Sequence, residues 1–512
     1  MSTTRFCVAL RTDASAIIGT GHLKRCLSLA VALREVGAEV RLVTRHLGLD
    51  IERMMHGSDV EQVLLPAPAS TGSPQIADET VPHAGWAGIS WHDDAEQTAE
   101  ALAGWPCTWM VVDHYAFDAR WHRQVALRLG ARIAAIDDLA DRDMAVDVLI
   151  DHNHSADHRI KYAGRLADKA LLLGGPRFAL LGSAYADLQA LCVEEFVVSI
   201  GIFMGGVDAA NLSALALRAC REHAGFTGPI EIAATHTYPH LAALAELSKQ
   251  WPPTTITVDS PDLAGFFSRH GLQIGAGGGA TWERCRAGAP TLALVGANNH
   301  RAVVPTLAEI GAGASLAEDA PLDPNTVGRA IASLLCDAAR RRALAQRARS
   351  LVDGLGARRG ALALAAESLA VRAAQSDDAA RSFEWRNNPE TRSVSRDQNE
   401  IDWSDHVQWL ARTMSDPTQY LMMGHVGDVD VGVIRFELRG DDSYEVSLYL
   451  DPALYGLGLG ARLLARGEAA LAAHYDGGLV LSATVLEGNE VSRRLFARAG
   501  YQFDGLAWRK RL

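Results

Sequence analysis

The chain has 512 residues, of which 48% are hydrophobic, 21% charged and 6% aromatic, and its formal net charge is -12. This length exceeds what one hydrophobic core supports, so roughly three domains are expected. The composition excludes a disordered chain. A negative charge without any concentrated basic stripe argues against nucleic acid or an anionic membrane as the main partner. We therefore expect small polar molecules as partners.

Cysteine usage and apolar runs give the expected compartment. Seven cysteines are scattered along the chain without a CxxC pair, which argues against a disulfide framework and against a zinc ribbon. A reducing compartment is therefore expected. No apolar run approaches the roughly 20 residues of a membrane helix, and the N-terminus lacks the apolar core of a signal peptide. We expect a cytoplasmic protein.

Short apolar runs alternate with amphipathic helical stretches through the first 370 residues, a pattern typical of βα units and parallel sheets. A new run of strands begins after the loop at 174–182, so we expect two doubly wound domains, 1–172 and 173–371, which face each other across a cleft. The runs that predict strands are 6–10, 40–44, 109–113, 132–137, 197–204, 231–235, 272–276 and 291–296.

The pattern changes near residue 372. Residues 372–382 are small and polar without apolar periodicity, and they predict a linker. Within 383–512 a helical stretch is followed by alternating segments and then by a helix after a glycine turn, as in an α+β domain.

The first strand is followed by a glycine loop and a histidine. Gly19 and Gly21 precede His22, which lies at or near the start of a helix. Loops at the carboxyl edge of a parallel sheet bind ligands in open α/β proteins, and the helix dipole there disfavours a protonated imidazole. His22 is thus either a proton acceptor or a polar cap beside a tight turn.

The second half contains two further glycine turns, each after a strand and before a helix. Such turns let backbone amides approach phosphate oxygens, and Glu283 could accept hydrogen bonds from a ribose diol. Neither turn is followed by the spacing of a dinucleotide site, so together they favour a nucleotide diphosphate. Their residues are Gly205, Gly206 and Asp208 in the first turn, and Gly277, Gly278, Thr281 and Glu283 in the second.

These motifs in this order resemble the UDP-sugar hydrolases of pseudaminic acid biosynthesis, relatives of the two-domain glycosyltransferase-B enzymes. The resemblance covers residues 5–365 and implies that water removes UDP from UDP-2,4-diacetamido-2,4,6-trideoxy-β-L-altropyranose without a metal. His22 matches the family's catalytic histidine, a general base toward water. The motifs are Arg11 to Ser15, Gly19 to Cys26, Asp113 to Tyr115, Asp137 to Arg142, Met204 to Leu212 and Gly275 to Glu283.

Other site residues follow from this resemblance. Tyr115 matches a tyrosine near the catalytic histidine, where it would position water or sugar, although a buried aromatic ring is an equal interpretation. The resemblance also implies which residues contact the UDP-sugar. They are those of the two glycine turns, together with Asp13, Gly19, Gly21 and Asn299. The chain reads Asn299-His300 where related sequences commonly read Asn-Gln.

The C-terminal segment contains a further glycine turn that could bind a ligand. Gly456, Gly458 and Gly460 expose consecutive backbone amides at a helix start, which suits a pyrophosphate. The order of strand, loop, helix, strand and Asn489 resembles the GCN5-related N-acetyltransferases over residues 383–512. The resemblance implies acetyl-CoA as co-substrate, with contacts from Leu448, Leu450, Tyr455, Gly456, Gly458, Gly460, Ala461 and Asn489.

Two positions depart from that family's pattern. Tyr455 replaces the usual Gln or Arg, and Phe496 replaces the tyrosine that protonates the departing thiolate. Ser492, Tyr501 or a water would have to serve instead, or the helix dipole alone assists departure. Glu445 is a candidate base for the substrate ammonium, or otherwise a solvent-facing acid.

The segment Trp385 to Asn388, with His406 and Trp409, resembles the subgroup that acetylates the 4-amino group of UDP-linked 4-amino-4,6-dideoxy sugars. The sequence therefore predicts a bifunctional enzyme that acetylates such a sugar and then removes UDP. The alternatives are a glycosyltransferase fused to an acetyltransferase, and a protein acetyltransferase whose first half senses a nucleotide sugar.

Overall fold

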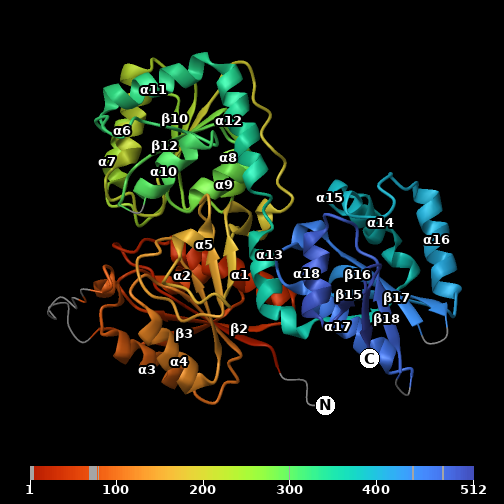
Figure 1. Ribbon diagram of the computed structural model, residues 1–512. Helices are drawn as coiled ribbons and strands as arrows, with labels where there is room; N and C mark the ends of the chain where they lie inside the picture. Colours follow the sequence, from red (N-terminus) through yellow and green to blue (C-terminus); the bar gives the residue numbers. More distant parts are fainter. Residues whose placement is uncertain (1–4, 69–77, 79, 299, 441–442, 476–477) are drawn as a thin grey trace. The chain divides into compact units, whose positions relative to one another are not determined.

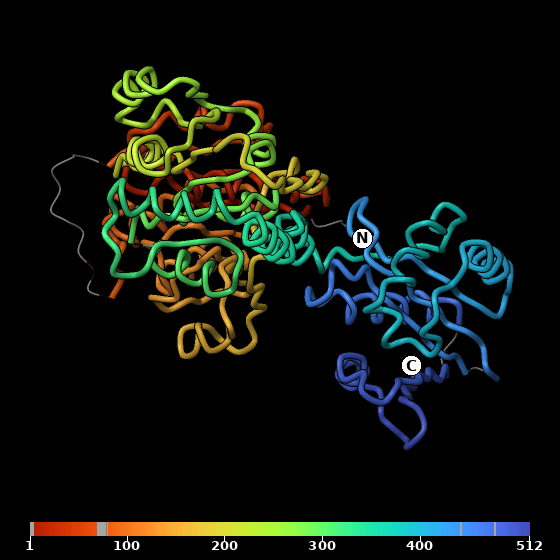
Figure 2. Tube along the Cα trace, turned by 90° about the horizontal axis from the view of Figure 1, so that it is seen from above, coloured from red at the N-terminus to blue at the C-terminus, as the bar shows by residue number. Residues whose placement is uncertain are grey.

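The computed structural model describes residues 5–68, 78, 80–298, 300–440, 443–475 and 478–512. Two compact units divide the chain: Met1–Arg34 with Ala38–Gly360, and Glu35–Gly37 with Ala361–Leu512. Figure 1 labels the elements of both units. Figure 2 traces the same chain from above, with the second unit in teal and blue.

The first lobe of the first unit is a seven-stranded parallel sheet in the order β3-β2-β1-β4-β5-β6-β7. Its strands are β1 (Cys7–Thr12), β2 (Glu39–Arg45), β3 (Glu61–Leu65), β4 (Trp109–Asp113), β5 (Arg132–Ile136), β6 (Val148–Asp151) and β7 (Leu171–Gly174). Its helices are α1 (Gly21–Glu35), α2 (Ile51–Met55), α3 (Trp91–Ala101), α4 (Ala119–Leu129) and α5 (His158–Lys161). Every residue of β1 and β4 is buried, as expected for strands covered on both faces.

The second lobe repeats this scheme with six parallel strands in the order β10-β9-β8-β11-β12-β13. The strands are β8 (Ile200–Phe203), β9 (Ile230–Ala234), β10 (Thr254–Val258), β11 (Leu272–Ala276), β12 (Thr291–Leu294) and β13 (Ala314–Ser315). The α-helices are α6 (Leu212–Arg218), α7 (Leu241–Ser248), α8 (Leu263–Arg269), α9 (Ala280–Ala287), α10 (His300–Glu309), α11 (Pro324–Cys336) and α12 (Ala338–Leu351). The next helix, α13 (Gly356–Leu364), begins in the first unit, where a Cβ on Gly360 would contact Leu29 and Ile150 of the first lobe.

The strand order reverses once in each lobe, between β1 and β4 and between β8 and β11. Ligands of open α/β sheets bind outside the carboxyl ends of the strands at such a switch point. Each predicted strand of this unit is present, with ends shifted by up to three residues. The expected boundary at 172 falls inside β7, which pairs with β6 and therefore belongs to the first sheet.

The second unit contains a seven-stranded mixed sheet in the order β14-β15-β16-β17-β18-β20-β19. Its strands are β14 (Ala370–Ala373), β15 (Gln419–Val426), β16 (Val429–Gly440), β17 (Ser443–Leu450), β18 (Val480–Ala483), β19 (Gln502–Phe503) and β20 (Trp508–Arg511). The α-helices are α14 (Ala379–Asn387), α15 (Pro389–Ser393), α16 (Trp403–Ser415), α17 (Leu459–Ala472) and α18 (Glu490–Arg498).

Strands β17 and β18 are parallel and pair only from Ser443 to Glu445, although β17 continues to Leu450. The remaining length of β17 is thus unpaired on that side among the described residues. The strands β17 and β18 therefore separate toward the end of β17, which leaves an opening in the sheet. The glycine turn and α17 follow β17 directly in the chain.

The segment predicted as a linker is regular structure. Residues 372–382 contain the end of β14, a short 3-10 turn and the start of α14. Arg372 donates to both carboxylate oxygens of Asp378 at 2.7 and 2.8 Å and also reaches Asp430 at 3.1 Å. The polar composition that suggested a linker therefore reflects an ion-pair network at a sheet edge.

The first lobe contains buried histidines whose titration opposes folding in acid. Burial lowers the pKa of His122 to about 3 and that of His152 to about 4. The unfolded chain binds these protons near pH 6.5 and the folded lobe does not, so the free energy of unfolding falls between pH 6.5 and 4. Each histidine contributes up to about 3 kcal/mol.

Calorimetry checks this dependence on pH. We expect His122→Gln to flatten the fall in melting temperature between pH 7 and 5, because glutamine can still accept from the Ala145 amide, which donates to His122 Nδ1 at 3.3 Å. An exposed control, His92→Gln, is expected to leave the slope unchanged. An unaltered slope in His122→Gln would contradict the assignment.

Candidate functional site

His22 and Asp113 meet at the switch point of the first lobe. Asp113 ends β4 and His22 lies in the first turn of α1, which follows β1. The His22 Nδ1 atom lies 2.6 Å from Asp113 Oδ1. Arg25, one turn further along α1, donates from Nε and Nη2 to the two oxygens of the same carboxylate, at 2.5 and 2.6 Å.

The charges of this cluster select one form of the imidazole. Burial alone would raise the pKa of Asp113, but Arg25 and His22 outweigh it and hold that pKa below its ordinary value. An ionised carboxylate only accepts hydrogen bonds, so His22 donates from Nδ1. In the neutral ring Nε2 then carries the lone pair, which is the form a general base needs.

Aromatic rings surround the imidazole. The Tyr115 ring lies edge-on at 4.7 Å from the His22 ring, and Trp86 lies at 6.1 Å. The Tyr115 hydroxyl donates to Asp138 Oδ1. Burial, and next the charge of Asp138, raise the pKa of Tyr115, so its hydroxyl stays protonated. Tyr115 is thus both a buried ring and a neighbour of the histidine.

The other predicted residues of this loop have different surroundings. Gly19 has φ +80° and its amide donates to Ser15 at 2.8 Å, which closes a turn before Gly21 begins α1. Asp13 is fully buried, and both of its oxygens accept hydrogen bonds from Arg11. The Arg45 amide also donates to Asp13, at 2.7 Å. Asp13 therefore stabilises the loop through buried hydrogen bonds.

The first glycine turn of the second lobe approaches the first lobe. A Cβ on Gly206 would collide with the Thr20 hydroxyl, so glycine allows the two loops to come close. Gly205 has φ +95°. Asp208 accepts from the amides of Leu212 and Ser213 at 2.8 and 2.9 Å, so its carboxylate satisfies two backbone donors at the start of α6.

The second glycine turn leads into α9. A Cβ on Gly277 would collide with Val304 and approach His300, while a Cβ on Gly278 would lie 3.4 Å from His300 Nε2. Thr281 is buried, whereas Glu283 in the same turn is partly exposed. Burial raises the pKa of Glu283. Asn299 lies outside the described residues.

A cavity of about 220 Å³ lies between the two lobes. Trp282 donates from its indole to Asn153 at 3.2 Å, and Asn153 donates to Asp138 at 3.0 Å. Because Asp138 also accepts from Tyr115, a chain of polar contacts connects the cavity wall to the ring beside His22. The cavity is lined by Asp138, Leu139, Asn153, His154, Ser155, Lys161, Trp282, Ala302, Val303, Thr306, Leu307 and Ile310.

The glycine turn of the second unit has the geometry of an amide cradle. Gly456 and Gly458 have φ of +85° and +77°, and open space lies where a Cβ would be. Leu457 and Leu459 between them are buried and anchor the turn. Gly460 and Ala461 lie in the first turn of α17, whose amides have no partner within the helix.

The predicted contacts around this turn lie on neighbouring elements. Leu448 and Leu450 end β17, and the Tyr455 hydroxyl lies 3.0 Å from Thr391 Oγ1. Asn489 caps α18, because its Oδ1 accepts from the Ser492 amide at 3.0 Å. Leu448 and Leu450 lie on the part of β17 that is not paired with β18.

Glu445 is embedded in an ion-pair network. It accepts from Arg396, from Arg439 at 3.0 Å and from Thr484 at 3.1 Å. Burial would raise the pKa of Glu445, but these donors outweigh it and lower the pKa. A carboxylate in this state is a weak base, so proton uptake would require at least one arginine to move.

The residues near Phe496 have separate partners. Phe496 is buried beside the Tyr501 ring at 5.0 Å. The Tyr501 hydroxyl donates to Glu468 at 2.8 Å, and Lys510 lies 2.5 Å from the other oxygen of Glu468. Tyr501 is thus tied into the core, which favours Ser492 or water over Tyr501 as the proton donor.

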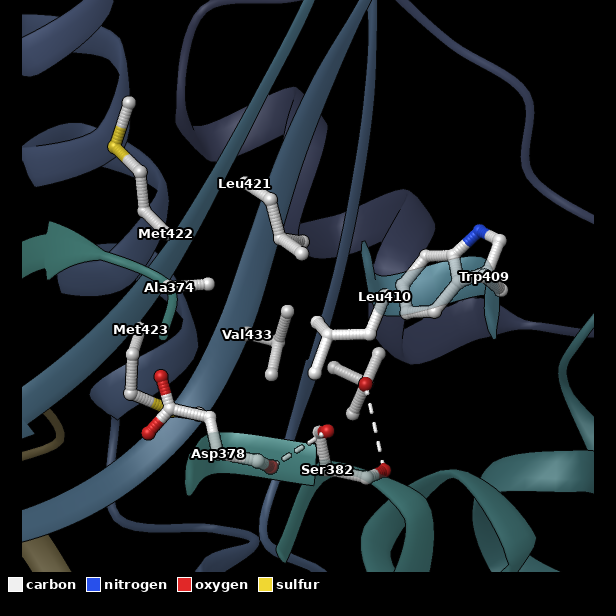
Figure 3. Close-up of a pocket in the computed structure, with 10 residues that line it drawn as sticks. Ala374, Asp378, Ser382, Trp409, Leu410, Leu421, Met422, Met423 and Val433 are labelled. Carbon is white, nitrogen blue, oxygen red and sulfur yellow. Dashed lines mark hydrogen bonds between the residues drawn. The ribbon is translucent and has the colours of Figure 1, made fainter. Parts of the chain in front are cut away.

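The tryptophan segment forms a small apolar core. Trp385 is buried, and His406 Nε2 lies 3.0 Å from Ser382 Oγ within the same core. Figure 3 shows Leu410, Leu421 and Val433 directed toward a small pocket that Trp409 borders. These side chains therefore hold α14 and α16 against the sheet.

Arg25, Asp113 and Asp138 contact His22 or its neighbours in the candidate site, although the sequence did not select them as site residues. Asp113 and Asp138 both lie in recognised motifs at strand ends, and that placement is the signal that could have selected them. No group of histidine, cysteine and acidic residues suited to a metal is found in the described ranges. Within those ranges no helix combines the length and apolarity of a membrane span.

Comparison with known proteins assigns the second unit first. Residues 368–502 match a family model described as an acetyltransferase (GNAT) domain. The match covers nearly all of the second unit. A solved aminoglycoside acetyltransferase, AAC(6')-Ib in complex with coenzyme A, is 15% identical and covers 28% of this chain and 95% of its own, with a TM-score of 0.26.

The first unit is similar to solved proteins with two Rossmann-like lobes. A UDP-glucosyltransferase from Polygonum tinctorium, capable of glucosylating indoxyl and solved with 3,4-dichloroaniline, is 12% identical and covers 71% of this chain and 98% of its own, with a TM-score of 0.51. MurG of Acinetobacter baumannii is 15% identical over 70% of this chain and 98% of its own, with a TM-score of 0.48.

These likenesses concern architecture. The chain combines a glycosyltransferase-B-like fold with a C-terminal GNAT domain, as the sequence predicted. No curated protein matched the chain.

Proposed function

We propose that the chain is a bifunctional enzyme of pseudaminic acid biosynthesis. Its GNAT domain acetylates the 4-amino group of UDP-4-amino-4,6-dideoxy-N-acetyl-β-L-altrosamine with acetyl-CoA. Its first unit hydrolyses UDP from the product, UDP-2,4-diacetamido-2,4,6-trideoxy-β-L-altropyranose. The observation that carries the proposal is the His22–Asp113 pair at the switch point, connected by polar contacts to the cavity between the lobes.

In the hydrolysis, water attacks the anomeric carbon while the bond from that carbon to the diphosphate oxygen breaks. His22 Nε2 takes the proton from water, and UDP leaves with the electron pair of the broken bond. Asp113, 2.6 Å from Nδ1, stabilises the imidazolium that forms. The proton then passes to solvent, and the neutral ring is restored.

The second lobe supplies the diphosphate site. Its two glycine turns lie at the carboxyl ends of β8 and β11, on either side of the switch point. Backbone amides at the start of α9 suit phosphate oxygens, and the partly exposed Glu283 suits the ribose diol.

In the acetyl transfer, the amine nitrogen attacks the thioester carbonyl and the carbon–sulfur bond breaks, so coenzyme A leaves as a thiolate. The glycine turn fits a pyrophosphate because Gly456 and Gly458 leave open space above the amides. Glu445 removes the ammonium proton, directly or through water. Ser492 or water gives a proton to the thiolate, and the second proton that nitrogen loses as the amide forms replaces it on that donor.

One assay with two readouts tests both steps. The full chain is mixed with the UDP-linked 4-amino sugar and acetyl-CoA, and coenzyme A thiol and UDP are followed separately. We expect thiol to appear before UDP, and both to appear without a sugar acceptor. Thiol without UDP would favour the glycosyltransferase alternative, which the likeness to a UDP-glucosyltransferase keeps open. UDP without thiol would contradict the GNAT assignment.

Glu445→Gln tests the base of the acetyl transfer. We expect kcat at pH 7 to fall about tenfold to a hundredfold, and the deficit to shrink at pH 9, because the amine then loses its proton to solvent. Glu437→Gln is the matched control, since Glu437 lies directly across the strand pair from Glu445 and also binds Arg439. Equal losses of kcat in both variants, or a loss in Glu445→Gln that does not change with pH, would show that Glu445 has only a structural role.

A further inference from the structure

Arg284 is a buried cation directly beneath the second glycine turn. It lies in α9, and only 1% of its surface is exposed. Its Nη2 atom donates to the Ala276 carbonyl at 2.7 Å and to Thr281 Oγ1 at 3.2 Å. Both acceptors flank the turn Gly277 to Gly279, so the guanidinium lies against the turn from inside the lobe.

The charge of Arg284 has little compensation in the free protein. Among the described residues, its Nε and Nη1 atoms have no hydrogen-bond partner and its guanidinium makes no ion pair, although the Glu283 carboxylate acts on it at longer range. Burial lowers the pKa of Arg284 to about 10, and Cys285 and Glu283 offset this only in part. The buried Arg11 differs, because Asp13 and Asp94 both pair with it.

A second buried arginine shows that carbonyl oxygens can satisfy such a group. Arg341 donates from its two terminal nitrogens to four backbone carbonyls, at 2.6 to 3.1 Å. Arg284 reaches one carbonyl and one hydroxyl. A buried charge with unpaired hydrogen-bond donors destabilises the folded lobe. An anion bound near Arg284 would offset that unfavourable free energy.

The guanidinium also lies at the switch point of the second lobe. A Cβ on Gly275 would collide with Arg284 Nη1 and would lie 2.9 Å from the Phe203 carbonyl at the end of β8. Arg284 therefore occupies the space between the ends of β8 and β11. The two glycine turns of the lobe leave the sheet from these same strand ends.

We propose that Arg284 is a positioning residue whose missing counter-charge is the diphosphate of a nucleoside diphosphate bound above the turn. The inference rests on the proposed function of this lobe. The guanidinium attracts the diphosphate through the thin layer of the turn without touching it, and low-dielectric surroundings strengthen this attraction. The charge of Arg284 adds nothing to the affinity for the uridine part of the ligand, which is uncharged.

Calorimetric titration of the full chain with UDP, uridine and inorganic pyrophosphate tests the proposal. We expect the neutral variants Arg284→Gln and Arg284→Met to bind UDP and pyrophosphate about tenfold or more weakly, with uridine unchanged, and Arg284→Lys to stay within about threefold. Arg286→Gln is the matched control on the same helix, since Arg286 donates instead to the Ala186 carbonyl. It should bind all three ligands as the wild type does.

Several outcomes would overturn the proposal. If the neutral variants bind UDP as tightly as the wild type, or lose affinity for UDP and uridine equally, Arg284 has only a structural role. Failure of both neutral variants to fold without ligand would mean that the cation already has its partner in the free protein. A wild type that binds pyrophosphate but neither UDP nor uridine would contradict the proposed function, while the pyrophosphate arm would still test Arg284.

Discussion

Replacing His22 with glutamine is expected to reduce UDP release about a thousandfold, because water would lose its proton acceptor. Glutamine retains a polar side chain at the start of α1, so folding should be preserved. The measurement is UDP formed from the diacetamido sugar nucleotide in single turnover. Acetyl transfer by the same chain serves as the internal control, since the GNAT domain does not use His22.

Asp113→Asn separates the role of the ring from that of its partner. An amide cannot stabilise the imidazolium and can present its N–H to Nδ1, which would favour the tautomer whose Nε2 carries the proton. We expect UDP release to fall at least about a hundredfold while UDP affinity stays near the wild-type value. A His22→Gln enzyme that still releases UDP at the wild-type rate would refute this mechanism.

Gly458→Val is expected to raise the KM for acetyl-CoA about tenfold or more. Gly458 has φ +77° at the start of α17, where a β-branched residue is strained by roughly 1–2 kcal/mol and would narrow the approach to the amides. Initial rates at varied acetyl-CoA, with the 4-amino sugar nucleotide saturating, give this value. UDP release from the acetylated sugar should be unaffected.

Gly505→Val is the matched control for that experiment. Gly505 has φ +97° between β19 and β20, also with open space where a Cβ would lie. It should lower the melting temperature by a similar amount without changing the KM. If both variants changed the KM alike, strain rather than the amide cradle would explain the effect.

Local patterns predicted much of this fold. Apolar runs such as 109–113 and 272–276 became buried strands with the same limits, because strands covered on both faces need uninterrupted apolar residues. The polar segment 372–382 misled the prediction, since its charges pair with Asp430, which lies far along the chain. Composition alone cannot distinguish an exposed linker from a paired sheet edge.

The amino-acid sequence by itself determined the order of strands, turns and helices, and with it the places where His22 and the glycine turns begin their helices. It did so because apolar periodicity and glycine positions are local properties. Only the tertiary structure placed Asp113 against His22 and Arg25, connected Tyr115 to Trp282 through polar contacts, and left two donor nitrogens of Arg284 without a hydrogen-bond partner among the described residues. These contacts depend on which strand ends become neighbours at a switch point. Asp113 lies 91 positions from His22 and 88 from Arg25, which is beyond the reach of any local pattern.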